Sequence, residues 1–304
     1  MKSKSQPSYI LQDKITGDWV VVAPGRQARP YGFKPKGKVK DSLVPDGHKG
    51  QNIIATYGQG EDKMTVIQNL FPVFERTRGV TGWQEVIIEG YRVMRFWDSS
   101  VARVAALLDA LAERCVTLRS DPQIKYLQVF KNDGSSAGAT QPHPHAQIYA
   151  MSFVPDRLRE RALRRRAAVK KLGMSSHRYS LELATRARMV YSDSRVVAYA
   201  NPAARLPYEV RILTRREIDN ITKATPDERR SLAKAMHALL PLMKQKKLGY
   251  NFFFHDVLDE TDEHFEIRFT PRPNVWGGFE LDAGIFVNPV SAESAAEEYR
   301  RAKG

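Results

Sequence analysis

"NDGSSAGATQPHPHAQIYA", residues 132–150, places two of the chain's seven histidines two positions apart, where a run of small residues passes into an alternating apolar segment. Side chains of an extended segment alternate between its two faces, so His143, His145 and Gln147 share one face. The prolines before each histidine fix two φ angles and remove two backbone donors, which stiffens the segment without a regular ladder. The pattern predicts a rigid turn that enters a strand with polar groups on one side.

This arrangement suits nucleophilic chemistry on phosphorus. An imidazole with one nitrogen bonded to a nearby carbonyl presents the other nitrogen as a lone pair, and a neutral imidazole can displace a phosphate leaving group. The preceding loop offers backbone N–H groups, and Asn132, Ser135 and Thr140 can donate to phosphate oxygens. Two other interpretations remain for a bare His-x-His: a metal site, or a pair of turn and packing residues.

Composition narrows the class of protein. A chain of 304 residues with 42% apolar residues is long enough for two globular domains. It contains no run of eighteen apolar residues, and its first residues lack the apolar middle of a secretory signal, so we expect a cytoplasmic protein and no membrane association. A single cysteine, Cys115, builds neither a disulfide framework nor a Cys-rich zinc site.

The net charge of +14 favours anionic partners such as nucleotides, sugar phosphates or nucleic acid. Much of this charge is local, because residues 156–171 hold eight basic and two acidic residues. A solvated helix face is the simpler interpretation of that run, and a nucleic-acid groove is the alternative.

Two similar sets of elements follow each other along the chain. Strands are predicted over 19–24, 85–90, 124–130, 146–151, 189–200, 208–214, 250–257 and 264–270. Helices are predicted over 98–118, where Asp98 to Ser100 are the candidate N-caps, from Thr225 with a capping box to Glu228, and over 291–301. The stretch 34–62 is interpreted as a long loop and 156–180 as a basic linker.

The order of these elements predicts an α+β fold of two units packed side by side, each a mainly antiparallel sheet with packed helices. We place the units at residues 1–175, with the His-Pro-His motif, and 176–304, where that motif is degenerate.

The stretch "NDGSSAGATQPHPHAQI" resembles the signature of the galactose-1-phosphate uridylyltransferase family. This family is a two-domain branch of the histidine-triad superfamily that includes ADP-glucose phosphorylases. The segments 13–30, 69–74, 82–89, 207–217 and 277–300 follow in the family's order, so the resemblance extends over nearly the whole chain.

The resemblance implies a two-step exchange. His145 would attack the α-phosphorus of a nucleoside diphosphate sugar and release a sugar 1-phosphate, and a second phosphate-bearing acceptor would then take the nucleotide. Gln147 would hold a non-bridging oxygen, and the carbonyl of His143 would orient the nucleophile. Positions that match substrate contacts are Arg26, Arg29, Asn69, Asn132, Gly138, Thr140 and Glu280. The resemblance also suggests a homodimer.

The sequence departs from the family at its metal sites. Zinc-binding members use a Cys-x-x-Cys pair near residue 45 and a histidine after the 85–89 strand, and neither is present here, although Asp46 and His48 are possible harder ligands. A second, structural metal uses histidines where this chain has Glu266, Arg268 and Thr270. We therefore predict no structural zinc and no cofactor.

The sugar-binding end departs as well, because Asn274, Phe279 and Phe286 replace polar family residues. Losing hydroxyl-binding groups changes which ligand is accepted, so the acceptor is a different sugar phosphate or inorganic phosphate. Two alternatives to this nucleotidyltransferase remain. One is a histidine-triad hydrolase of dinucleoside polyphosphates or adenylylated nucleic acid, and the other is a non-catalytic nucleotide-binding protein.

Overall fold

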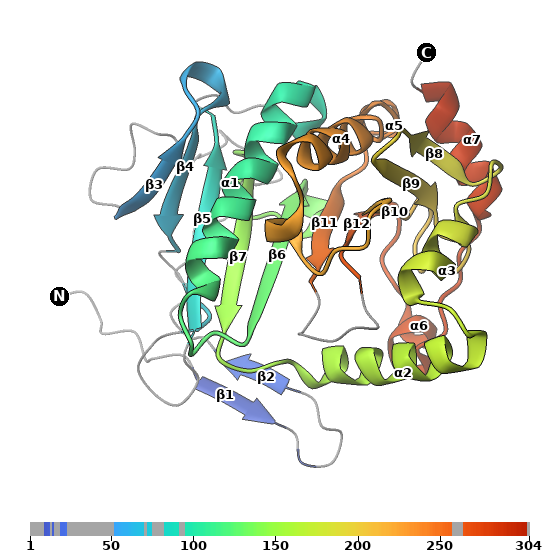
Figure 1. Ribbon diagram of the computed structural model, residues 1–304, viewed down its shortest axis with the longest axis horizontal. Helices are drawn as coiled ribbons and strands as arrows, with labels where there is room; N and C mark the ends of the chain where they lie inside the picture. The colour runs from blue at the N-terminus through green and yellow to red at the C-terminus, as the bar shows by residue number, and fades with distance from the viewer. Residues whose placement is uncertain are drawn as a thin grey trace.

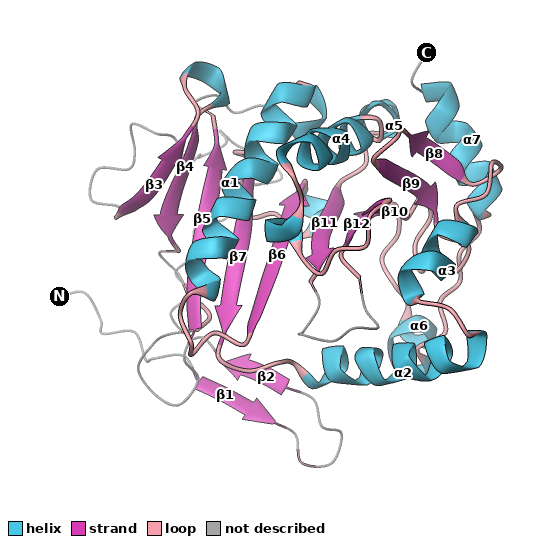
Figure 2. Ribbon diagram, in the orientation of Figure 1, coloured by secondary structure: helices cyan, strands magenta, loops and turns pink. Residues whose placement is uncertain are grey.

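A computed structural model describes residues 9–12, 14, 19–22, 52–69, 72–74, 82–90, 95–256 and 264–302. Its centre is a ten-stranded antiparallel sheet in the order β3-β4-β5-β7-β6-β11-β12-β10-β9-β8 (Figures 1 and 2). The strands are β3 (Ile53–Tyr57), β4 (Met64–Gln68), β5 (Gly82–Glu89), β6 (Tyr126–Asp133), β7 (His145–Met151), β8 (Met189–Ser192), β9 (Val196–Ala200), β10 (Val210–Thr214), β11 (Tyr250–His255) and β12 (Glu266–Pro271). A separate hairpin joins β1 (Tyr9–Gln12) and β2 (Trp19–Val22).

The sheet consists of two halves with the same topology. The first half has the order β3-β4-β5-β7-β6, and the second has β8-β9-β10-β12-β11, so the halves meet where β6 pairs with β11. In each half a helix follows the third strand: α1 (Val101–Arg119) in the first and α4 (Pro226–His237) in the second. The predicted α+β fold with two similar antiparallel units is confirmed. The boundary at residue 175 stays a prediction.

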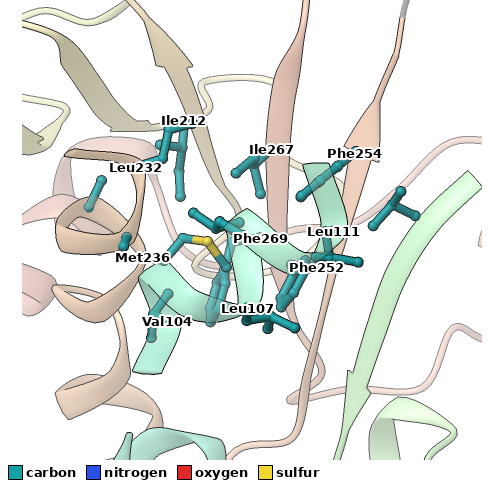
Figure 3. Packing of buried hydrophobic residues seen from close by; sticks show 14 of the residues in the cluster. Val104, Leu107, Leu111, Ile212, Leu232, Met236, Phe252, Phe254, Ile267 and Phe269 are labelled. Atoms are coloured by element: carbon teal, nitrogen blue, oxygen red, sulfur yellow. The ribbon is translucent and has the colours of Figure 1, made fainter. Parts of the chain in front are cut away.

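One face of the sheet carries the apolar core. Helices α1 and α4 pack side by side over this face, and Leu107, Leu111 and Met236 point from them toward Phe252 and Ile267 of β11 and β12 (Figure 3). All of these side chains are buried. Alternation along the strands therefore leaves the polar residues of the same strands on the opposite face.

The opposite face is partly covered by α2 (Asp156–Leu172), which is followed by α3 (Ser176–Leu183). The remaining helices are α5 (Leu240–Lys246), α6 (Gly278–Ala283) and α7 (Ala292–Ala302), and α6 lies near α2 and α3 in Figure 1. No helix in the described ranges is long and apolar enough to cross a membrane.

The predicted helix starts are confirmed. Ser100 caps α1 by accepting a hydrogen bond from the Arg103 N–H at 3.1 Å. Thr225 and Glu228 form the predicted capping box, with reciprocal bonds of 2.8 and 3.2 Å.

Two sequence interpretations are wrong. Residues 34–62 are not a loop throughout, because Ile53–Tyr57 is a strand that pairs with β4. The run of β-branched and aromatic residues there suits a sheet edge. The interpretation of 156–180 as a linker is wrong too, because α2 and the start of α3 occupy it, whereas the interpretation of the 156–171 charge run as part of a helix is confirmed. Leu158, Ala162 and Arg165 recur at helical spacing and turn toward the sheet, whereas Leu163 and Arg164 are exposed.

Candidate active site

His145 is the first residue of β7, between β5 and β6 near the middle of the first half. Ala146 and Ile148 of the same strand face the core, so His145 and Gln147 face the opposite side. Both side chains are 4% exposed. The strand thus places the two predicted catalytic groups together on the polar face of the sheet.

The tautomer of His145 is fixed by its neighbour two residues earlier. The Nδ1 atom of His145 lies 2.8 Å from the carbonyl oxygen of His143, so Nδ1 carries the proton and Nε2 carries the lone pair. The Nε2 atom of His143 in turn lies 3.1 Å from the carbonyl oxygen of Gly90. The turn itself is held to β5, because the Glu89 N–H donates to the Pro144 carbonyl at 3.0 Å.

A buried ion pair supports this strand from the core side. The Nζ atom of Lys131 lies 2.5 Å from Oε1 of Glu89 and 3.4 Å from the carbonyl oxygen of His145. The Lys131 and Glu89 side chains are fully buried. Arg103 donates to the Glu89 carbonyl at 2.5 Å, which ties α1 to the same place.

Asn132 lies next to His145 across the sheet. The register Lys131↔Ala146, continued by one residue, sets Asn132 opposite His145. The Nδ2 group of Asn251 donates to Asn132 Oδ1 at 2.7 Å and to the Ala137 carbonyl at 2.8 Å. Because Asn132 Oδ1 is an acceptor there, its NH₂ group is the part that can donate to a ligand.

Asn132 and Asn251 line a cavity of about 310 Å³ on the polar face. It lies over the junction of the two halves, with aromatic and amide side chains from β6 and β11 and basic side chains from α2 and β12. Its lining includes Tyr126, Gln128, Phe130, Phe253, His255, Arg161 and Arg268.

The sequence predicts that the glycine-containing loop after β6 offers backbone N–H groups to a ligand, and the structure confirms this only in part. The N–H groups of Ala137 and Ala139 donate to the Gly134 carbonyl, and that of Gly138 donates to Ser135. These three donors serve the loop's own turn, which Gly138 permits with a φ of +81°. Thr140 remains suited to a ligand, because its buried Oγ1 has no hydrogen-bond partner within the described ranges.

The other predicted substrate contacts are dispersed. Asn69 follows β4, and its N–H donates to the Gln84 carbonyl at 2.9 Å. Arg26 and Arg29 lie outside the described residues. Glu280 lies on α6, where its carboxylate accepts the Gly277 N–H at 3.0 Å, and α6 lies away from β7 in Figure 1. Within one chain, Glu280 therefore does not join His145.

Sequence reasoning missed two residues of the site. Asn251 holds Asn132, and its signal is a polar residue inside the apolar stretch "YNFFFH". Lys131 supports His145 from the core side, and its signal is a lysine two positions after Val129, on the core-facing side of the strand.

The described residues around Glu266 do not fit the second metal that the resemblance implies. No group of three or more His, Cys, Asp or Glu side chains is placed to hold an ion within these ranges. At the second position, Glu266 is surrounded by arginines, with Arg268 at 2.6 Å, Arg211 at 3.4 Å and Arg165 at 3.8 Å. Their positive charge opposes a divalent cation there. Asp46 and His48 lie outside the described residues.

Fold and site together define a histidine-triad-like protein in which a five-stranded unit occurs twice and one copy carries the His-Pro-His motif. Residues 72–155 match the family model described as galactose-1-phosphate uridyl transferase, N-terminal domain. The chain is thus similar to the galactose-1-phosphate uridylyltransferases and to an ADP-glucose phosphorylase, the family that the sequence indicated.

Relatives of both kinds cover nearly the full length. The ADP-glucose phosphorylase of Arabidopsis thaliana is 26% identical over 98% of this chain and 93% of its own. The galactose-1-phosphate uridylyltransferase of Thermotoga maritima is 23% identical over 96% and 97%. A solved uridylyltransferase structure superposes with a TM-score of 0.81 at 24% identity, covering 97% of this chain and 98% of that one.

Proposed function

We propose that this protein is a nucleotidyltransferase that moves a nucleoside monophosphate from a nucleoside diphosphate sugar to a phosphate-bearing acceptor. In the first step Nε2 of His145 bonds to the α-phosphorus, the bond from that phosphorus to the bridging oxygen breaks, and the sugar 1-phosphate leaves. In the second step an acceptor phosphate oxygen displaces the histidine, which restores the imidazole. Similarity to uridylyltransferases and to an ADP-glucose phosphorylase supports this reaction type.

The observation that carries the proposal is the 2.8 Å contact between His145 Nδ1 and the His143 carbonyl. In the neutral imidazole this contact places the proton on Nδ1 and the lone pair on Nε2, and it stabilises the positive charge of the ring once Nε2 bonds to phosphorus. Gln147 on the same face and the NH₂ group of Asn132 beside the ring can donate to phosphate oxygens.

The acceptor is inorganic phosphate or a sugar phosphate other than galactose 1-phosphate. Two of the three changed residues at the sugar end are apolar: Phe279 is exposed, and Phe286 lies 4.8 Å, between ring centroids, from Trp276. Neither phenyl ring can bind a sugar hydroxyl as a polar side chain would. A phosphorylase reaction needs no such contact on its acceptor.

Intact-protein mass spectrometry tests the first step. The protein is mixed with UDP-glucose or ADP-glucose without acceptor and quenched, and one covalently attached nucleotide is expected. His145→Asn should abolish the adduct, whereas His237→Asn, a histidine at the end of α4, should keep it. An adduct retained in His145→Asn, or none with any nucleotide sugar, contradicts the proposal.

Adding acceptors then separates the reaction classes. Loss of the adduct with inorganic phosphate, giving a nucleoside diphosphate, indicates a phosphorylase, and loss with a sugar phosphate indicates a transferase. Adduct loss in buffer alone, at the same rate with or without either acceptor, indicates the alternative hydrolase.

A homodimer is part of the proposal. Residues 275–287 expose several large apolar side chains, with Val275 96% exposed, and the other members are Phe279, Leu281, Ile285 and Val287. A second copy of the chain is the expected partner, because it would cover these side chains and bring Glu280 toward a site that its own chain does not reach. Light scattering should give twice the chain mass, and Val275→Glu with Leu281→Glu should halve it. The matched change Val116→Glu, at an exposed valine of α1, should not.

The proposal also retains a cytoplasmic location and catalysis without zinc. Elemental analysis of the active, purified protein should find less than one zinc ion per chain, and activity should survive a chelator.

A further inference from the structure

The second half of the sheet contains a place that corresponds to the His145 site. Glu266 is the first residue of β12, as His145 is of β7, and both strands lie fourth in the order of their half. Ile267 and Phe269 face the core, so Glu266, Arg268 and Thr270 face the polar side. At the position that corresponds to His145, the second half therefore has the charged residue Glu266, with Arg268 beside it on the same face.

A small cavity of about 120 Å³ lies beside these residues. Its lining is dominated by arginines from α2, β10, β12 and the segments next to these strands: Arg161, Arg205, Arg211, Arg268 and Arg272. It shares Arg161, Phe253, Arg268 and Arg272 with the 310 Å³ cavity, so the two spaces adjoin.

The protein supplies too few carboxylates for this cavity. Glu209 is the one acidic residue in its lining. The nearby carboxylate of Glu266 is already paired with Arg268 and Arg211. Neither Arg161 nor Arg205 forms an ion pair with any residue of the described ranges. Burial, followed by the neighbouring charge of Arg268, lowers the pKa of Arg161 to about 10. Burial and the charge of Arg157 likewise lower the pKa of Arg205.

Three buried donors around the cavity lack a hydrogen-bond partner in the described part of the protein: Nε of Arg211, Oγ1 of Thr270 and Nε1 of Trp276. Thr270 is only 7% exposed. A buried polar group without a partner is costly, so such groups cluster where something else completes them. Every one of these groups can donate and the guanidinium groups cannot accept, so the missing partner is an acceptor.

We propose that this cavity is a second ligand site that binds a phosphate group, either as inorganic phosphate or as the phosphate of a small phosphorylated metabolite. Phosphate oxygens accept two parallel bonds from a guanidinium, and the planar fork of arginine matches them. The adjoining cavity, with its aromatic and amide lining, has room for the organic part of a metabolite. The site does not use His145, so it stands independently of the proposed reaction.

Isothermal titration calorimetry in a chloride buffer tests the proposal with two probes, inorganic phosphate and glucose 1-phosphate. Saturable binding of either is expected, and the tighter probe identifies the source of the phosphate group. Arg161→Gln with Arg205→Gln should raise the Kd about tenfold or more, because each removes a charge-assisted contact. Arg164→Gln is the matched control, since Arg164 is on the same helix with an 81% exposed side chain.

His145→Asn should leave this binding unchanged, which separates the result from the fate of the proposed reaction. Fluorescence provides a second readout, because phosphate should change the emission of Trp276 in the wild type and not in Trp276→Phe. Absence of saturable binding to both probes overturns the proposal. So does an equal loss of affinity in Arg164→Gln, or in His145→Asn, because the anion would then bind elsewhere.

Discussion

Replacing Lys131 with methionine should destabilise the protein by about 3–5 kcal/mol, because it leaves a buried carboxylate without its counter-charge. The Lys131 and Glu89 side chains are both 0% exposed and their charged atoms lie 2.5 Å apart, so water neither screens the pair nor replaces the lost partner. Methionine has similar length, which keeps the cavity contribution small. Urea unfolding followed by circular dichroism measures the change as a shift of the midpoint at constant slope.

The double variant Lys131→Met with Glu89→Met isolates the charge from the packing. It removes both ionised groups, and buried pairs replaced by apolar residues of similar size are often neutral, so most of the lost stability should return. The reasoning is refuted if Lys131→Met unfolds at the wild-type urea concentration. It is equally refuted if the double variant is no more stable than the single one.

Three further changes test other parts of the structure. Burial, against the opposing charge of Arg119, raises the pKa of Asp256 to about 6, so this acid contributes stability at low pH that is lost as pH rises through 6. Asp256→Asn should therefore be more stable than the wild type by about 2–3 kcal/mol at pH 7.5 and equal to it near pH 4, measured by urea unfolding at both values. Burial opposes the charged form of Glu266, but Arg211, Arg268 and Arg165 outweigh it and hold its pKa well below the usual range. Ionised Glu266 thus stabilises the fold above about pH 4.5, and this stabilisation is lost only in stronger acid. Thermal melts should therefore show Glu266→Gln to be much less stable than the wild type at pH 7, with a smaller difference below about pH 4. An equal difference at both pH values would contradict this. Thr225→Ala removes the cap of α4 and should cost about 1 kcal/mol, and a loss below the error of the urea midpoint would argue against the cap.

The parts of the fold that were predictable have local causes. The Ser100 and Thr225 caps and the alternation around His145 are short-range signals, and each element formed where expected. Strand β3 was missed because its residues lie at a sheet edge with mixed exposure, so they show no clear alternation. The inward turn of Arg161 was missed because a charge run looks the same whether it faces water or a ligand cavity.

The candidate site was predictable to a similar extent. His145, His143 and Gln147 are close in sequence, so their shared face follows from strand geometry alone. Asn251 reaches Asn132 from 119 positions away, through a pairing between halves that no local pattern encodes. The role of Glu280 depends on which surface α6 meets, and a single sequence does not specify that.

The β6–β11 junction has a consequence for dissecting this protein. Strands β6 and β11 are edge strands of their own halves, and they pair with each other from Tyr250↔Asp133 to Phe253↔Phe130. This pairing satisfies the main-chain groups of two edges that would otherwise be open at the middle of the molecule. A fragment cut after α2 would present β6 with open N–H and C=O groups, a template for pairing with a second fragment. Such a fragment should self-associate through β6, so truncation is a poor way to ask what either half does alone, and point substitutions in the intact chain are the better tool.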